Sequence, residues 1–276
     1  METNFKWKNL GKKDYQVAEK FLINNEFKYV GACSRFLNRN KKDEFWALCS
    51  PVTDEIYAMA IYSKKLLYPV LPGCHVISDE IINKPIYSIQ GPINDVIMTE
   101  EAAKKKSIVP AESVNYDLMT LDSTVNTESI RCVPENLVLR LPVKKDFNDI
   151  FFLQAGYEKE EVLPAGSLFN PTVCKSNLEK MLQTEEMMLA CFGSRVVGKI
   201  NTNAKSFTRY QIGGVYIKPE YRGIGIATKM TAGFTEYLLK KNRGVSLFVK
   251  KTNANAKRVY TKVGFTVKGD YRISYY

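Results

Sequence analysis

Two glycines, Gly223 and Gly225, separate a strand-like segment from a helix-like one, and this junction constrains the fold more than any other feature. The preceding residues, Tyr210–Ile217, are rich in β-branched and aromatic side chains and predict a strand, after which Pro219 ends the pairing. A helix that starts near Ile226 would direct free N–H groups and the positive end of its dipole at an anion, and glycine lets a phosphate approach the backbone. The pattern favours a phosphate-binding turn, although an ordinary tight strand-to-helix turn would share it. The apolar residues at helical spacing are Ile226, Met230, Phe234, Tyr237 and Leu238.

A second informative segment, Asn253–Phe265, follows a short apolar strand at Val245–Val249. Asn253, or Thr252 before it, suits the N-cap of a helix, and Gly264 is a natural residue just past its C-terminal end. The segment therefore predicts a short capped helix. The residues at helical spacing are Ala254, Ala256, Val259, Tyr260 and Val263, of which Tyr260 taken alone would be a core aromatic residue.

In this order and at this separation, the two segments resemble the two main motifs of the GNAT acyltransferase superfamily, which moves an acetyl group from acetyl-CoA to an amine. The resemblance covers about Leu137–Tyr276 and implies a mixed α/β sheet flanked by helices, with two parallel strands that splay apart around the cofactor. The other helices predicted here are Lys144–Tyr157 and Pro171–Gln183, and the other strands are Leu137–Leu141, Met187–Phe192, Val196–Thr202, Phe265–Lys268 and Arg272–Tyr276.

The resemblance also implies a role for each motif residue. The N–H of Val215 would stabilise the oxyanion that forms when an amine attacks the thioester. Tyr260 would protonate the leaving thiolate, and Asn253 would bond the pantetheine or phosphate arm. No metal is needed. The other residues expected to bind acetyl-CoA are Tyr216, Ile217, Arg222, Gly223, Ile224, Gly225, Ile226, Ala227 and Thr228.

The general base is not identified by the sequence. Members of the superfamily often carry Glu or Asp on the fourth or fifth strand, whereas Tyr210–Ile217 and Val245–Val249 contain no carboxylate. A water chain or an acceptor that arrives already neutral would also serve. The candidate carboxylates are those of Glu158, Glu160, Glu161, Glu185 and Glu186 and the C-terminal carboxylate of Tyr276.

The charge distribution favours an anionic ligand in the second half of the chain. Residues 1–134 carry equal numbers of basic and acidic side chains, so the net charge of +11 falls entirely on residues 135–276. Coenzyme A carries about four negative charges, which such a field would attract. An ordinary solvated basic face would look the same. The basic residues beside the two motifs are Lys229, Lys250, Lys251, Lys257, Arg258 and Lys262.

Two other function classes remain open. One is a regulatory module that binds CoA or acyl-CoA without turnover, and the other is a basic protein associated with nucleic acid. The sequence contains no helix-turn-helix, zinc-finger spacing or RNP-like aromatic pattern, so nucleic acid is not the expected partner. The expected partners are acetyl-CoA and an amine acceptor, which can be a small molecule or a protein amine.

The first half predicts a separate α/β domain at residues 1–126, ahead of a GNAT-like domain at residues 127–276, with a polar linker at Asp122–Glu135. Its order of hairpin, strand, glycine, helix and strand echoes the second half. It therefore resembles a degenerate GNAT-like domain of two-domain members, and without an Arg-x-x-Gly-x-Gly/Ala motif it is expected to lack a cofactor site. The predicted helices are Gln16–Asn25 and Asn94–Lys106, and the predicted strands are Phe45–Leu48, Glu55–Ile61, Leu66–Leu71, Ile86–Gln90 and Tyr116–Leu121.

Cysteine and histidine usage limits the remaining chemistry. The six cysteines are scattered without a C-x-x-C pair, which indicates reduced thiols of a cytoplasmic protein. His75 is the only histidine, so metal binding is not expected. A structural role is expected for this residue instead. The N-terminus lacks the apolar core of a signal peptide, and no apolar run reaches membrane-spanning length. The oligomeric state is not predicted.

Overall fold

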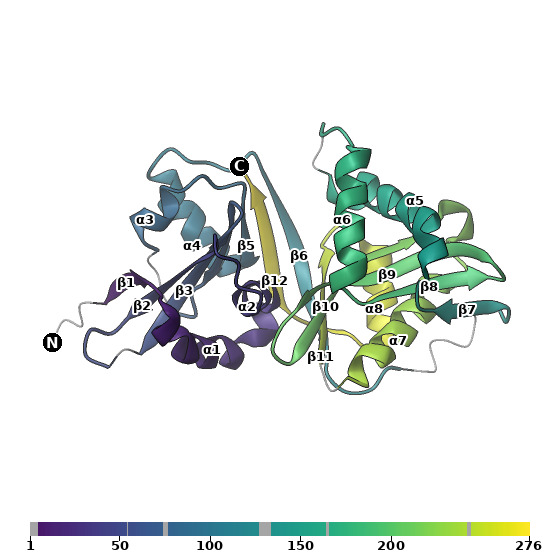
Figure 1. The fold of residues 1–276 in the computed structure, drawn as a ribbon, viewed down its shortest axis with the longest axis horizontal. Helices are drawn as coiled ribbons and strands as arrows, with labels where there is room; N and C mark the ends of the chain where they lie inside the picture. The colour runs from purple at the N-terminus through teal and green to yellow at the C-terminus, as the bar shows by residue number, and fades with distance from the viewer. Residues whose placement is uncertain (1–4, 54, 74–76, 127–133, 164–165, 242–243) are drawn as a thin grey trace. The chain divides into compact units, whose positions relative to one another are not determined.

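The computed structural model describes residues 5–53, 55–73, 77–126, 134–163, 166–241 and 244–276 (Figure 1). The chain forms two compact units of mixed α/β structure. Unit 1 comprises Met1–Leu118, Lys205–Arg209 and Lys268–Tyr276, and unit 2 comprises Met119–Ala204 and Tyr210–Val267. Each unit therefore combines segments that are far apart in the sequence. The predicted linker lies partly outside the described residues.

Unit 2 contains the helices and strands predicted for residues 137–265. Its strands follow the order β11-β10-β9-β8-β7, and β7 with β8 and β8 with β9 are antiparallel. The adjacent strands β10 and β11 are joined through a helix, the connection that parallel strands need. The bounds are β7 (Leu137–Arg140), α5 (Phe147–Tyr157), α6 (Pro171–Thr184), β8 (Met187–Phe192), β9 (Arg195–Lys205), β10 (Arg209–Ile217), α7 (Ile226–Leu239), β11 (Gly244–Lys250) and α8 (Ala254–Val263).

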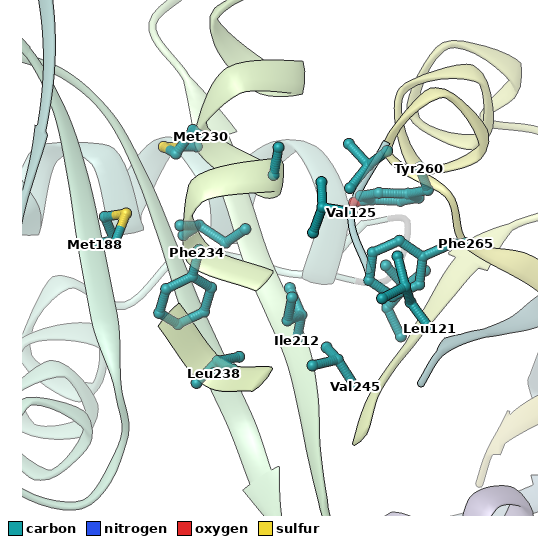
Figure 2. Packing of buried hydrophobic residues seen from close by; sticks show 14 of the residues in the cluster. Leu121, Val125, Met188, Ile212, Met230, Phe234, Leu238, Val245, Tyr260 and Phe265 are labelled. Carbon is teal, nitrogen blue, oxygen red and sulfur yellow. The ribbon is translucent and has the colours of Figure 1, made fainter. Parts of the chain in front are cut away.

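The sheet of unit 2 has an apolar core on each face. Helices α7 and α8 cover one face and α5 and α6 cover the other (Figure 1). Successive residues of a strand point to opposite faces, so Val215 and Ile217 pack in the core under α7 and α8, while Tyr216 packs in the core under α5 and α6. The first of these cores includes Phe234, Leu238, Val245 and Phe265 (Figure 2).

Unit 1 also has an apolar core on each face of its strands. Its strands follow the order β1-β2-β3-β4-β5-β12-β6. One core lies under α1 and α2, and a second lies under α3 and α4. The bounds are β1 (Lys6–Asn9), α1 (Tyr15–Asn24), α2 (Val30–Leu37), β2 (Glu44–Cys49), β3 (Ile56–Ser63), β4 (Leu66–Val70), α3 (Asp79–Ile82), β5 (Ser88–Pro92), α4 (Ile93–Lys104), β6 (Glu112–Leu121) and β12 (Thr266–Tyr275). The sequence did not predict β1, α2 or α3.

The last strand of the chain differs from its prediction. The two predicted C-terminal strands are one continuous strand, β12, whose residues from Lys268 onward belong to unit 1. There β12 runs antiparallel to β5, with Arg272 opposite Gly91. In the opposite direction, the last residues of β6 belong to unit 2, where Met119 and Leu121 join the core under α7 and α8.

A short segment between β9 and β10 also belongs to unit 1. The buried carboxylate of Glu26 accepts a hydrogen bond from the Thr208 amide at 2.7 Å and bonds the hydroxyls of Ser206 and Thr208. One carboxylate thus collects three donors, which offsets the cost of burying its charge.

The described ranges lack two features, a membrane-spanning helix and a cluster of metal-ligating side chains. No helix there is long and apolar enough to cross a membrane. Among the same residues, no group of three or more His, Cys, Asp or Glu side chains is placed to hold a metal ion. Cys33, Cys49, Cys174 and Cys191 are buried, reduced cysteines, while Cys74, Cys132 and His75 lie outside the described residues.

Candidate functional site

Strand β10 is distorted at Gly214, immediately before the predicted oxyanion donor. Gly214 has a φ of +58°, in the left-handed region, and a Cβ at this position would lie 2.2 Å from the side-chain oxygen of Asn201. Only glycine fits both constraints. The next residue, Val215, is partly buried against the core under α7 and α8.

The turn after β10 brings two left-handed glycines to the start of a helix. Gly223 has a φ of +85° and Gly225 one of +83°, and Gly225 is the residue immediately before α7. The first turn of α7 directs N–H groups without intrahelical partners toward this turn. The Arg222 side chain donates to the carbonyl of Ile217 at 2.9 Å, which ties the turn to β10. We refer to Arg222–Gly225 as the glycine turn. Its geometry suits the binding of an anion.

Helix α8 is the capped helix that the sequence predicts. Asn253 is its N-cap and Tyr260 is one of its buried residues. The Asn253 side-chain oxygen accepts from the Ala256 amide at 3.0 Å and caps the helix. Tyr260 is only 8% exposed and lies in the core beside Phe265, at 6.2 Å between ring centroids (Figure 2). Its hydroxyl makes no hydrogen bond to another described residue. Burial, with further contributions from Tyr157 and Glu161, raises the pKa of Tyr260, so the phenol stays protonated.

An acidic turn, Glu158–Val162, follows α5 in a π-helical conformation and contacts β10 and the glycine turn. Glu160 accepts from the Tyr216 hydroxyl at 2.7 Å and from the Arg222 guanidinium at 2.8 Å. Burial acts to raise the pKa of Glu160, but these two hydrogen bonds hold it below its usual value. Burial and the same carboxylate raise the pKa of Tyr216 to about 12.

The acidic turn reaches α8 through its next residue, Glu161. The carboxylate of Glu161 accepts from the Asn253 side-chain amide at 3.3 Å and lies 3.4 Å from the Lys250 ammonium. A hollow of about 360 Å³ opens beside this contact, within the range of ligand pockets. It is lined by Glu161, Lys250, Thr252, Asn253, Ala254 and Asn255.

The predicted carboxylates fall in different surroundings. Glu160 and Glu161 contact motif residues, as described. Glu185 accepts from the Thr202 hydroxyl at 2.6 Å, and Glu186 pairs with Lys241 and accepts from Tyr237. The C-terminal residue, Tyr276, belongs to unit 1, where its amide donates to the Tyr87 carbonyl at 3.0 Å.

One residue of the site was missed by the sequence analysis. Lys199, on β9, is fully buried, and its ammonium nitrogen lies 2.9 Å from the Gly214 carbonyl oxygen. A single basic residue inside the apolar run from Val196 to Ile200 was the available signal. This signal in the sequence does not indicate which groups the Lys199 side chain contacts.

Fold and site together define an α/β protein in which a strand, a glycine turn and a helix N-terminus form a junction whose geometry suits an anion. Residues 154–265 match the model of the family described as Acetyltransferase (GNAT) family. The chain therefore contains a GNAT-family domain, as the two motifs predicted. The comparison with curated proteins gives no match.

Solved structures extend the likeness to almost the whole chain. A Drosophila protein from a structural genomics consortium has a TM-score of 0.68 at 9% identity and covers 98% of both chains. A tandem GNAT protein from the clavulanic acid biosynthesis pathway has a TM-score of 0.61 at 11% identity, again over 98% of both chains. A GCN5-related N-acetyltransferase from Sphaerobacter thermophilus has a TM-score of 0.61 at 17% identity and covers 98% of this chain and 94% of its own. The predicted fold, a GNAT-like domain preceded by a second GNAT-like domain, is confirmed.

Proposed function

We propose that the protein is an acetyl-CoA-dependent N-acetyltransferase that acetylates a primary amine by direct attack of the amine on the thioester. The observation that carries this proposal is the pair of left-handed glycines at the start of α7, inside the GNAT domain. The amides of residues 223–228 and the Thr228 hydroxyl would hold the pyrophosphate, because a helix N-terminus with glycines ahead of it offers donors and no Cβ in the way.

The other motif residues would hold the pantetheine arm and carry the chemistry. The N–H of Val215 would stabilise the oxyanion, and Ile217 with Tyr216 would line the arm beside the Asn253 amide. Tyr260 would give its proton to the thiolate as it leaves, so no free thiolate is released, and the proton that the amine loses on attack would return to the phenolate through solvent. Because burial raises the pKa of Tyr260, the phenol carries the proton that this role needs, and it would give that proton up only as negative charge develops on the sulfur. These steps require no metal ion.

Charge supports the same ligand. Arg222, Lys250 and the Asn253 amide, which are the groups that would meet the anionic and amide parts of acetyl-CoA, now contact the carboxylates of the acidic turn. In charge and in hydrogen bonding, a carboxylate of the acidic turn resembles the anionic group of a ligand. We place the reaction in the cytoplasm, with acetyl-CoA and an amine as the partners, consistent with the buried, reduced cysteines.

The deciding experiment is calorimetric titration and thermal unfolding with acetyl-CoA, longer acyl-CoAs and free CoA, followed by turnover with a panel of amines. At a ligand concentration 100 times Kd, binding should add about 2.7 kcal/mol to the free energy of unfolding. Binding with no turnover of any amine would favour a regulatory module instead. Duplex DNA binding that falls steeply with salt and is not displaced by CoA would favour a nucleic-acid protein. Failure of every acyl-CoA to bind would refute the proposal.

A further inference from the structure

Lys199 is a buried cation whose side chain is directed at one peptide group of β10. Its ammonium nitrogen donates to the Gly214 carbonyl at 2.9 Å and to the Asn201 side-chain oxygen at 2.7 Å. The ring of Tyr157 lies 5.1 Å from the same nitrogen. A buried ammonium is costly unless it is partnered, so a lysine at this position calls for a reason beyond packing.

Position 214 is shaped to receive this lysine. A Cβ on Gly214 would lie 2.8 Å from the Lys199 nitrogen and closer still to Asn201. The left-handed backbone at Gly214 turns its carbonyl toward Lys199 and away from the regular strand pattern. The contact of Lys199 with Asn201 and with the Gly214 carbonyl therefore requires a glycine at position 214.

The carbonyl that accepts from Lys199 belongs to the same peptide unit as the N–H of Val215. The unit is planar and trans, so its C=O and N–H point in opposite directions, and fixing the oxygen also fixes where the N–H points. A charged donor on the oxygen draws electron density through the amide and makes the N–H a stronger donor. The Val215 N–H is thus aimed away from Lys199 and polarised by it.

We infer that Lys199 is a positioning residue that orients and polarises the Gly214–Val215 peptide so that the Val215 N–H binds the thioester carbonyl and its oxyanion. This inference rests on the proposed function, in which Val215 faces the acetyl group. Lys199 itself does not touch the substrate and acts through the peptide.

The protonation state of Lys199 gives the inference a pH signature. Burial lowers the pKa of Lys199 to about 7, although Glu158 and Cys174 act to raise it. The groups that face it are Tyr157 on α5, Glu158 of the acidic turn and Cys174 on α6, and burial raises the pKa of the Cys174 thiol to about 12. The ammonium form therefore prevails below neutral pH, and polarisation of the peptide weakens as the pH rises.

Infrared difference spectroscopy of bound acetyl-CoA, labelled with ¹³C at the acetyl carbonyl, tests this without an amine acceptor. In the wild-type protein the carbonyl stretch should shift to lower frequency on binding, more at about pH 6 than at about pH 9, with a midpoint near the pKa of Lys199. Lys199→Met keeps the length of the side chain and removes the donor. Its shift should be smaller and independent of pH, with the affinity for acetyl-CoA lowered by no more than about tenfold, the effect of one weakened hydrogen bond.

Lys180→Met is the matched control, since it removes a lysine from α6 that makes no contact with the peptide. It should behave as the wild type. A wild-type carbonyl shift that does not change with pH would overturn the inference even if Lys199→Met failed to fold, as would an unchanged shift in a folded Lys199→Met protein. Absence of acetyl-CoA binding by the wild type would instead refute the proposed function, and this inference with it.

Discussion

The two units of this chain share an architecture. They differ in the groups that contact the backbone where one central strand is connected to the next, after β4 in unit 1 and after β10 in unit 2. In unit 1, β4 and β5 are parallel and pair at Leu66 with Ser88 and at Leu67 with Ile89. In unit 2, the neighbouring strands β10 and β11 are joined through a fourteen-residue helix, α7, entered by way of the glycine turn.

Unit 1 has a carboxylate of its own at the end of β4. Asp95 of α4 is buried and accepts from the Leu71 amide, just after β4, at 2.8 Å and from the Tyr29 hydroxyl at 2.6 Å. The helix that follows β4, α3, has only four residues. The amide that follows β4 thus meets a carboxylate of the chain, whereas we propose that the amides at the glycine turn of unit 2 meet the phosphates of a ligand. We therefore propose that unit 1 holds no acetyl-CoA.

The largest expected effect concerns the glycine turn. Gly225→Asp should abolish acetyl-CoA binding, because it adds a Cβ and a negative charge where the phosphate would sit and strains a left-handed position. Calorimetry should give one acetyl-CoA per chain for the wild type and none for the variant. Gly193→Asp, at a left-handed turn with open space around it, is the control and should bind normally. Two ligands per chain, or binding by a folded Gly225→Asp protein, would break the comparison between the units.

A second prediction separates the buried tyrosines of the two units. Tyr260→Phe keeps the ring and removes the proton donor, so kcat with any accepted amine should fall roughly 10²–10⁴-fold while acetyl-CoA affinity changes little. Tyr29→Phe, in unit 1, should leave kcat unchanged. Steady-state kinetics of both variants measure the difference. If Tyr260→Phe kept the wild-type kcat, Tyr260 would be a core residue only.

A third prediction tests the internal carboxylate of unit 1. Asp95→Ala leaves the Leu71 amide and the Tyr29 hydroxyl without their acceptor and should lower the free energy of unfolding by about 1–3 kcal/mol, measured in urea. Acetyl-CoA affinity should not change. A large loss of affinity would mean that Asp95 supports the ligand site after all.

The same residue predicts a pH dependence. Burial raises the pKa of Asp95 despite its two hydrogen bonds. A carboxyl whose pKa is higher in the folded state favours folding below its unfolded pKa, and this contribution is lost as the pH rises through the folded pKa. The stability of the wild type relative to Asp95→Asn should therefore decrease as the pH rises above about 4.

The smallest effect concerns the acidic turn. Glu160→Gln frees Arg222 from an ion pair whose two side chains are 41% and 46% exposed, so the pair contributes at most about 1 kcal/mol. Acetyl-CoA affinity should rise by no more than about fivefold, as measured by titration. Glu220→Gln makes the same change in charge at an exposed site and should have a smaller effect. Weaker binding by Glu160→Gln would identify Glu160 as a ligand contact.

The junction from β10 to α7 could be predicted because its signals are local. A strand-forming run, a proline and two glycines ahead of an amphipathic segment each act within a few residues, and the fold class and the GNAT domain they indicated are confirmed. The roles given to Val215, Tyr260 and the cofactor-binding residues stay predictions, as does the domain boundary between residues 126 and 127. Lys199 could not be found this way, since its partner Gly214 lies on the neighbouring strand.

The sequence by itself determined the order of helices and strands in the GNAT domain, the glycine turn ahead of α7 and the cap of α8, because backbone sterics and hydrogen bonds between near neighbours set all three. Only the tertiary structure decided that β12 pairs with β5 and that Asp95, Glu160 and Lys199 meet the partners they do. Strand pairing and buried polar contacts join residues that are distant in the chain. The free energy of these contacts depends on which groups are buried together away from water. A local pattern of residues does not predict which groups these are.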